Sequence, residues 1–359
     1  MTKDRKRINF EGQRIHVGID VHKKSISVAI QTETRAYRPF TISPPSAEDL
    51  SNYLEKHFPG GDYLCAYEAG FSGFGLCESL QEKGIGCIVV NAADIPTSDR
   101  DSEFKTDARD ASKIARSLKS GDLTGIHLPS KELQGDRALA RLHDQFKRDL
   151  IRQKCRIKMN LYFFGIKIPE GYDGGGRWSR PFISWLYNLE MPTNESTSVL
   201  RQQMGQMIYV LGMKRNAERW LRALSRSARY VEQSDLLETV PGVGRLTAIK
   251  FLLQLGDISR FRSLDALCNY VGLVPSSHNT GERVRQSRLT RRGHTQLRVM
   301  MVEAAWVAIG VDPALNHCYE NLKKRMIGQK AIIRIARKLL SRIRYVLKHK
   351  VAYEKGILA

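Results

Sequence analysis

Asp107 and Asp110 lie three residues apart in the stretch FKTDARDASKIARSL of a chain that is otherwise strongly basic. Thr106, just before them, is a residue type that caps helix N-termini, so a helix is predicted from this point. The apolar stripe of that helix consists of Ala111, Ile114, Ala115 and Leu118. At the i, i+3 spacing the two aspartates are neighbours and continue the same face. Adjacent like charges repel unless a cation lies between them, so the pair indicates a cation site.

Two further acids fall on predicted strands. Asp20 lies in RIHVGIDVHKKSISVAI, where Ile and Val alternate with other residues, and strand stability alone does not favour an aspartate there. Glu68 ends the strand pattern DYLCAYE, at the place where open α/β sheets carry their sites. Carboxylates without His or Cys suit Mg²⁺, which accepts phosphate oxygens. We therefore predict that Asp20, Glu68, Asp107 and Asp110 hold one or two Mg²⁺ ions acting on a phosphodiester.

Each acid also has a purely structural interpretation. Asp107 and Asp110 could be helix-start acids that interact with the helix dipole, and Glu68 could be a solvated strand end. Four acids in this order on one predicted fold are a stronger indication than any one of them alone.

The elements around the acids predict a fold. Alternating apolar residues from Arg14 indicate a two-stranded hairpin, and a third strand is expected around Tyr37 to Ile42. A helix in SAEDLSNYLEKHF, the strand of Glu68, a helix in GFGLCESLQEKG, the strand GCIVVN and the aspartate helix follow. Three antiparallel strands followed by alternating helix and strand is the order of the RNase H-like, or RuvC-like, fold. We assign it to residues 14–130.

The charge balance of the whole chain is strongly positive. Its 359 residues include 58 lysines and arginines against 37 acids, a formal net charge of +21. Nucleic acid is therefore the expected partner. A membrane surface is the rival, but no apolar run approaches the ~20 residues that span a bilayer, and no signal-peptide core is present. We expect a soluble cytoplasmic protein whose six cysteines are small buried residues and form neither disulfides nor a zinc site.

The region 131–235 is rich in Arg, Lys, Leu and Met and is predicted to be helical, with an interruption at IPEGYDGGGRW. An apolar series in its second half follows steps of four and three: Leu200, Met204, Met207, Leu211, Leu221 and Ala228. Such spacing is typical of a coiled coil. The partner of the series could be another helix of the same chain or a second subunit.

The region 236–350 is also expected to be mainly helical, and it contains Pro241-Gly242-Val243-Gly244 between two helical patterns. A glycine turn at a helix start exposes N–H groups to a phosphate, as in helix-hairpin-helix modules, although alone it could be just a turn. The stretch that follows is predicted to be a phosphate-binding loop with Arg283, Arg285, Arg288, Arg291, Arg292 and Arg298. We predict nucleic-acid contacts from the two glycines and the first five arginines. The basic pattern KAIIRIARKLLSRIRYVLK is either a solvated face or a further contact with DNA or RNA.

Several blocks resemble one known family. GIDVHKK, YEAG, KTDARDASKIAR, GDLTGIHLPS, GLVPSSHNTGE, LTRRG and VEAAWVAI are similar to blocks of the DEDD transposases of bacterial insertion sequences. These are the insertion-sequence-110 family of bridge recombinases, related to the Piv-type invertases, and the resemblance covers nearly the whole chain. It implies that Asp20, Glu68, Asp107 and Asp110 are the family's acidic quartet. It also implies that helices of 131–235 join subunits into dimers or tetramers, and that 236–350 is the family's carboxy-terminal transposase domain.

The chain departs from the family at one position. In the family, a serine before the glycine of an SG pair attacks DNA and is held covalently, whereas the matching residue here is Thr280, followed by Gly281. A threonine hydroxyl can attack phosphorus, but its β-branched side chain is stiffer. We favour Thr280 as the nucleophile. The alternatives are that Ser276 or Ser277 replaces it, or that this copy is impaired; His278 could assist as a base.

The first functional hypothesis is an RNA-guided DNA recombinase or transposase. The resemblance implies a structured non-coding bridge RNA that pairs with target and donor DNA and is bound by its shape and backbone. It implies nicking through a covalent intermediate, with the acids of one subunit and the hydroxyl of another, in the bacterial nucleoid. The second hypothesis is a metal-dependent nuclease, such as a Holliday-junction resolvase, in which water attacks. A third, a binding protein without catalysis, is disfavoured because an acidic cluster repels phosphate.

Overall fold

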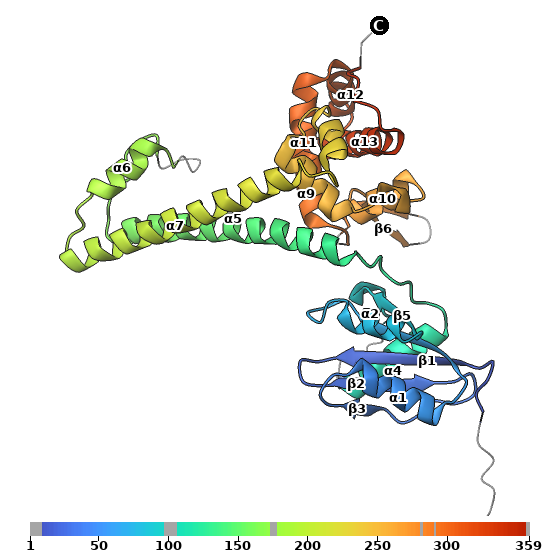
Figure 1. The fold of residues 1–359 in the computed structure, drawn as a ribbon. Helices are drawn as coiled ribbons and strands as arrows, with labels where there is room; N and C mark the ends of the chain where they lie inside the picture. The colour runs from blue at the N-terminus through green and yellow to red at the C-terminus, as the bar shows by residue number, and fades with distance from the viewer. Residues whose placement is uncertain (1–8, 97–105, 173–177, 281–282, 291, 357–359) are drawn as a thin grey trace, which may run out of the picture. The chain divides into compact units, whose positions relative to one another are not determined.

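The computed structural model describes residues 9–96, 106–172, 178–280, 283–290 and 292–356, and it does not describe the side chains of 276–288. The chain divides into two compact units, Met1–Leu128 and Pro129–Ala359. The first is a mixed α/β unit and the second is mostly helical (Figure 1). No single helix of the described ranges is long and apolar enough to cross a membrane; α11 and α12, defined below, reach that length only together and meet at a bend of 107°.

A five-stranded sheet forms the centre of the first unit. Its strands are β1 (Arg14–Val21), β2 (Ile26–Gln31), β3 (Phe40–Ile42), β4 (Asp62–Glu68) and β5 (Gly86–Val90). They are arranged in the order β3-β2-β1-β4-β5, with β1, β2 and β3 antiparallel and β1, β4 and β5 parallel. The predicted strands are confirmed, although the third is shorter than expected and begins at Phe40.

Three helices of the first unit match the predicted ones: α1 (Ala47–His57), α2 (Gly75–Glu82) and α4 (Asp107–Lys119); a short 3₁₀ turn, η1 (Ala92–Asp94), follows β5. The expected caps are present, because the Ser46 hydroxyl accepts from the amide of Asp49 and the Thr106 hydroxyl accepts from the amide of Arg109. The predicted apolar stripe of α4 is buried. Local sequence therefore decides where these helices begin and which face they bury.

Helix α4 lies close to β1 because Gly18 has no side chain. A methyl group at Gly18 would lie 2.1 Å from the carbonyl oxygen of Ala111 and 2.3 Å from the amide nitrogen of Ala115. Ala29 of β2 packs against the same two alanines, and all three are buried. These small residues let the helix backbone rest on the strands. The sheet thus fixes the position of α4 and of the aspartates at its N-terminus.

The second unit begins with a long helical hairpin. Helices α5 (Lys131–Phe163) and α7 (Asn194–Leu224) run side by side, and α6 (Arg180–Asn188) packs on them (Figure 1). Of the predicted apolar series, Leu200, Met204 and Met207 pack in the cluster that α5 contributes to, and Leu221 packs near Ala140 of α5. These four residues therefore pack within the chain, which is the first of the two alternatives above, whereas Ala228 is exposed and lies beyond the end of α7. A contact between subunits would have to use other residues.

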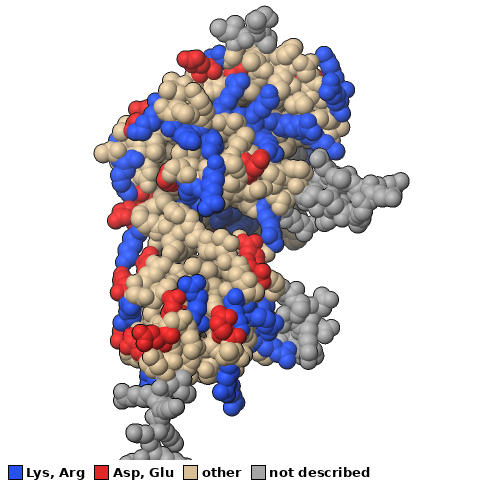
Figure 2. Space-filling model, turned by 90° about the vertical axis from the view of Figure 1, so that its right-hand side faces the viewer, with Lys and Arg blue, Asp and Glu red and all other residues tan. Residues whose placement is uncertain are grey.

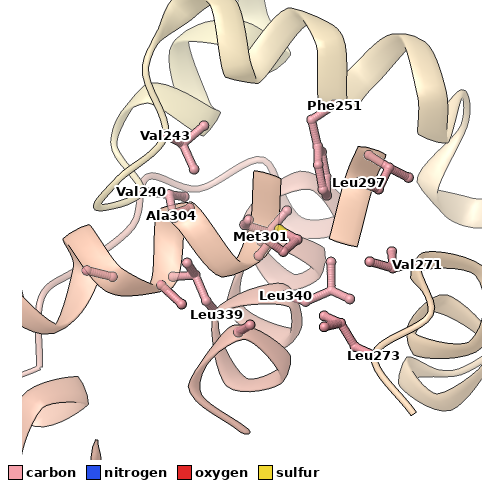
Figure 3. Packing of buried hydrophobic residues seen from close by; sticks show 14 of the residues in the cluster. Val240, Val243, Phe251, Val271, Leu273, Leu297, Met301, Ala304, Leu339 and Leu340 are labelled. Atoms are coloured by element: carbon pink, nitrogen blue, oxygen red, sulfur yellow. The ribbon is translucent and has the colours of Figure 1, made fainter. Parts of the chain in front are cut away.

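The rest of the second unit is a bundle around one hydrophobic core. Its helices are α8 (Val231–Glu238), α9 (Arg245–Leu255), α10 (Leu264–Val271), α11 (Thr295–Val311), α12 (Pro313–Lys323) and α13 (Gly328–His349), with a 3₁₀ turn, η2 (Ile258–Arg260). Figure 3 shows Val243, Phe251, Met301, Ala304 and Leu340 converging in this core from the turn before α9 and from α9, α11 and α13. The core holds α13 by its apolar face, so the basic face of α13 is left outside.

The segment after α10 differs from its prediction. It was expected to be a loop, but it forms two antiparallel strands, β6 (Pro275–Thr280) and β7 (Arg283–Leu289). The polar sequences of these strands lack the alternation of apolar residues that marks a half-buried strand. Their pairing is made by the backbone, which leaves little signal in the side chains.

Charged side chains join α5 to α9 and α11. The carboxylate of Asp144 on α5 accepts from the ammonium of Lys250 on α9, and also from the amide of Gln296 on α11 at 3.0 Å. Arg137 on α5 donates at 2.6 Å to a main-chain carbonyl of α9. Burial alone would raise the pKa of Asp144, but hydrogen bonds from His143 and Lys250 lower it overall. The root of the α5–α7 hairpin is therefore held by ionic contacts as well as by apolar packing.

We predict that Gly18→Ala destabilises the first unit. The added methyl group overlaps the backbone of α4, so the free energy of unfolding should fall by about 1–3 kcal/mol, as measured by chemical denaturation. Gly75→Ala is the matched control, because nothing lies within 4 Å of a methyl group built there; it should change stability by less than about 0.5 kcal/mol. Equal stability of the two variants would show that α4 is free to move away from β1.

Lys250→Met should destabilise the second unit by about 3–5 kcal/mol, because it leaves the buried Asp144 carboxylate without its cation. Lys147→Met, at an exposed position of α5, is the control and should be nearly neutral. In the wild type the contribution of Asp144 should be complete above the ordinary aspartate pKa of 3.8 and be lost as the pH falls through the lowered pKa. A Lys250→Met protein as stable as the control would contradict this role.

Candidate active site

Asp20 and Glu68 leave the sheet at the same end on adjacent strands. The residues just before them, Ile19 of β1 and Tyr67 of β4, are paired in the parallel ladder. Gly18, two residues before Asp20, faces α4, and side chains two apart in a strand share a face. Asp20 therefore points to the side of the sheet on which the N-terminus of α4 lies. The parallel register puts Glu68 on the same side.

The structure brings Asp20 and Asp107 together around His22. The Nε2 atom of His22 lies 3.0 Å from Oδ2 of Asp20 and 3.2 Å from Oδ1 of Asp107. One ligand atom from each of the three residues lies within 4.8 Å of the other two. The imidazole nitrogen thus lies between two carboxylates. A cation held at this position would neutralise the negative charges of both.

His22 was given no role in the prediction. It lies two residues after Asp20, and a period of two puts both side chains on one face of an extended chain. That spacing was the available signal. The spacing of Asp20 and His22 indicates a site only in combination with the position of α4, which brings Asp107 to the same face.

The surroundings of Asp20 disfavour the ionised form of its carboxyl group. Burial is the largest cause that raises the pKa of the Asp20 carboxyl, and the nearby carboxylates of Asp110 and Asp107 raise it further. The charge and hydrogen bond of His22 oppose this shift without cancelling it. Negative charges that a fold holds together in this way are stabilised by a bound cation.

Asp110 and Glu68 lie near the close cluster of Asp20, His22 and Asp107 but do not belong to it. Asp110, one turn along α4, is half-buried with Lys113 Nζ 3.4 Å away. Glu68 is exposed at the end of β4. The turn after it is fixed by the buried Tyr67, whose hydroxyl donates to the carbonyl of Gly73 at 3.0 Å. Among the described residues, the four predicted acids thus share one edge of the sheet, but only two of them belong to the close cluster.

The donor set fits a divalent cation. Two carboxylate oxygens and one imidazole nitrogen are within reach of a common ion. Carboxylate oxygens are the ligands that Mg²⁺ and Mn²⁺ prefer, while an imidazole nitrogen suits transition-metal ions such as Zn²⁺ and Fe²⁺. Because His22 adds a nitrogen donor to the predicted carboxylates, the residues suit a wider range of ions than carboxylates alone would.

The predicted glycine turn has a packing role. Gly242 has a φ of +82°, and a methyl group on it would lie 2.4 Å from the carbonyl oxygen of Ala304 on α11. Gly244 is exposed and is the N-cap of α9. The next residue, Arg245, pairs with Asp235 and with a second acid of α8. The structure thus joins α8 and α9 by a tight glycine turn, as the sequence predicted.

The predicted nucleophile and arginines lie on or after the β6–β7 hairpin. Thr280 ends β6 and pairs through its backbone with Arg283, the first residue of β7, which also contains Arg285 and Arg288. Their side chains lie outside the part of the structure that is described, as does the whole of Arg291. The following residue, Arg292, is exposed. The backbone therefore places Thr280 at the end of β6, opposite the first arginine of β7.

Comparisons with known proteins give consistent results. A DEDD transposase profile of the IS110 type matches residues 17–164, and a profile described as the transposase IS116/IS110/IS902 family matches residues 234–320. The protein y4qE of Sinorhizobium fredii is 28% identical over 81% of this chain and 70% of its own length. The transposase for insertion sequence element IS1533 of Leptospira borgpetersenii is 25% identical over 82% of this chain and 85% of its own. The pilin gene-inverting protein of Moraxella bovis is 32% identical over 35% of this chain and 40% of its own.

We predict that Asp20→Asn stabilises the metal-free protein at neutral pH. The folded protein binds the Asp20 proton more tightly than the unfolded chain does, so the ionised carboxylate lowers stability above its raised pKa. The variant should therefore need more denaturant to unfold in a chelating buffer. The difference should vanish below about pH 3.8, the ordinary pKa of the group. Asp49→Asn, an exposed acid in the first turn of α1, is the control and should bring no gain. An Asp20→Asn protein less stable than wild type would mean that the His22 contact outweighs burial and repulsion.

Proposed function

We propose a mechanism from the premise that the chain belongs to the IS110-type DEDD transposases and is therefore a DNA transposase or recombinase. In this proposal the protein nicks and exchanges strands of donor and target DNA through a covalent protein–DNA intermediate. The observation that carries this proposal is the meeting of Asp20 and Asp107 around one nitrogen at the edge of the sheet. A protein that only binds DNA gains nothing from carboxylates held together near phosphates.

Residues 14–130 would serve as an RNase H-like, or RuvC-like, catalytic domain. The strand order, with three antiparallel strands and then two parallel ones, supports this assignment. We propose Asp20, Glu68, Asp107 and Asp110 as the acidic quartet that holds Mg²⁺, with His22 as a further ligand or orienting group. The bound ion would polarise the scissile phosphate and neutralise its charge. The protein's part is to hold the carboxylates in place, which α4 and β1 do through their close packing at Gly18.

The nucleophile in this proposal is the Thr280 hydroxyl. Its oxygen would form a bond to phosphorus while one bond from phosphorus to a DNA oxygen breaks and that oxygen leaves with a proton. We propose that Arg283, Arg285, Arg288, Arg291 and Arg292 hold the surrounding phosphates, and that the turn of Gly242 and Gly244 contributes backbone donors. The backbone pairing of Thr280 with Arg283 puts the proposed nucleophile next to the first of these arginines.

A guide RNA and further subunits complete the proposal. Lys and Arg side chains are spread over the face of the second unit that Figure 2 displays. Together with the net charge of +21, this supports a large polyanionic partner besides the DNA duplex. We propose a structured bridge RNA that is bound by shape, and a homodimer or homotetramer that acts at the bacterial nucleoid. Since the buried face of α7 is occupied by α5, subunit contacts would use exposed residues of the hairpin such as Tyr209 and Trp220.

The decisive experiment is a search for DNA attached to protein. Purified protein, its flanking RNA and Mg²⁺ are incubated with a nicked suicide duplex, and products are analysed by denaturing gel and peptide mass spectrometry. We expect an adduct on Thr280 that is absent from Asp20→Asn and from Thr280→Val. Thr280→Ser should retain the adduct, because it keeps the hydroxyl and removes only a methyl group.

Two other outcomes would indicate a different nucleophile. Free cut ends without an adduct would mean that water attacks, as in a metal-dependent nuclease. An adduct on Ser276 or Ser277 would identify that serine, which also lies on β6, as the nucleophile in place of Thr280. Asp49→Asn should leave the adduct unchanged, which separates loss of a site acid from a general change in charge.

A further inference from the structure

An open groove of about 1180 Å³ lies in the second unit, between α10 and the base of the β6–β7 hairpin on one side and α13 on the other. Its floor is apolar, with Leu264, Leu273, Met326 and Ile333 among its lining residues. One wall is cationic and belongs to α13. Of the residues assigned to the proposed reaction, those whose side chains the structure describes do not line this groove.

The cationic wall is a regular row. Lys330, Arg334 and Lys338 follow at steps of four residues, and all three are exposed and line the groove. Within the described ranges no ion pair involves any of them, whereas Arg337 in the same wall pairs with Asp265. Steps of four residues raise the chain by about 6 Å along a helix, so the charges form a ladder along the groove.

The ladder is rigid because the opposite face of α13 is buried. Ile332, Ile335 and Leu339 alternate with the three cations and are buried in the core of the unit. The backbone of α13 therefore cannot turn without opening that core. Cations held at regular spacing along a groove suit the phosphates of a nucleic-acid strand.

The apolar floor distinguishes a single strand from a duplex. A duplex keeps its bases stacked inside and offers mainly phosphates to a basic surface, so leucine, methionine and isoleucine side chains would gain little from it. An unpaired strand can place sugars and bases on an apolar floor while its phosphates meet the cationic wall. The combination of floor and ladder thus fits a single strand.

The position of the β6–β7 hairpin indicates which nucleic-acid strand would occupy the groove. Pro275 and Leu289 line the groove at the base of the hairpin, and Thr280 lies five residues further along β6, about 17 Å at the rise of a strand. We propose that the groove between α10 and α13 binds the unpaired DNA strand next to the cleaved phosphate. The identity of the strand rests on the proposed function, in which Thr280 becomes linked to DNA; binding of single-stranded DNA does not.

The test uses full-length Asp20→Asn protein in a chelating buffer, so that binding is measured without cleavage or adduct formation. Affinities are compared for labelled oligothymidine, an oligouridine of equal length and a duplex of equal length. Adding Arg334→Gln and Lys338→Gln should weaken oligothymidine binding by about tenfold. The same pair should reduce the slope of log affinity against log salt concentration by about 1.4, because two phosphate contacts are lost on a single strand.

The control pair is Lys324→Gln and Lys348→Gln, which removes the same charge from exposed positions outside the groove. It should change both quantities much less. Ile333→Ser in the floor should weaken oligothymidine binding but leave the salt slope and duplex binding unchanged. Photocrosslinking from iodouracil-substituted oligothymidine should mark Met326 or Ile333.

Several results would overturn the proposal. Equal losses from the groove pair and the control pair would show that only overall charge matters. Equal losses for duplex and single strand would make the wall a duplex-binding surface, and tighter binding of oligouridine would assign the groove to RNA. Because no cleavage is measured, these results are independent of whether Thr280 forms an adduct.

Discussion

The approach of α4 to β1 at Gly18 is the constraint on which the candidate site depends. Because no side chain separates the helix from the strand, the backbone atoms of Ala111 and Ala115 rest where a methyl group would have to be. The helix begins at Asp107, one turn before that contact, so its first residues are carried to the end of β1 where Asp20 emerges. The carboxylates meet because two backbones touch, and any residue larger than glycine would separate them.

The two units use charge in opposite ways. In the first, burial and two neighbouring aspartates raise the pKa of Asp20, so the fold holds together charges that repel. In the second, hydrogen bonds from His143 and Lys250 lower the pKa of Asp144 and make its charge part of the framework. The first arrangement lowers the stability of the protein at neutral pH, whereas the second contributes to it.

Local patterns in the sequence predicted much of this architecture. The period of two around Asp20, the caps at Ser46 and Thr106, and the stripe of α4 each depend on residues close in sequence, and each is found as predicted. What failed depended on partners distant in sequence. The stripe of α7 shows that a partner exists but not that the partner is α5, and the polar hairpin β6–β7 has no apolar period to reveal it. His22 was missed for the same reason, since its position becomes meaningful only when α4 lies beside β1.

The α5–α7 hairpin has a mechanical consequence. Helix α5 is 33 residues long, which corresponds to about 50 Å, and its ionic anchors to α9 and α11 lie in its first half, at Arg137 and Asp144. A rod anchored near one end acts as a lever. The far end of α5, where α6 packs, lies roughly 30–40 Å beyond these anchors, so a rotation of about 5° there would carry it through about 3 Å. The stiffness of a few buried contacts at the root therefore sets how far anything bound at the tip can travel.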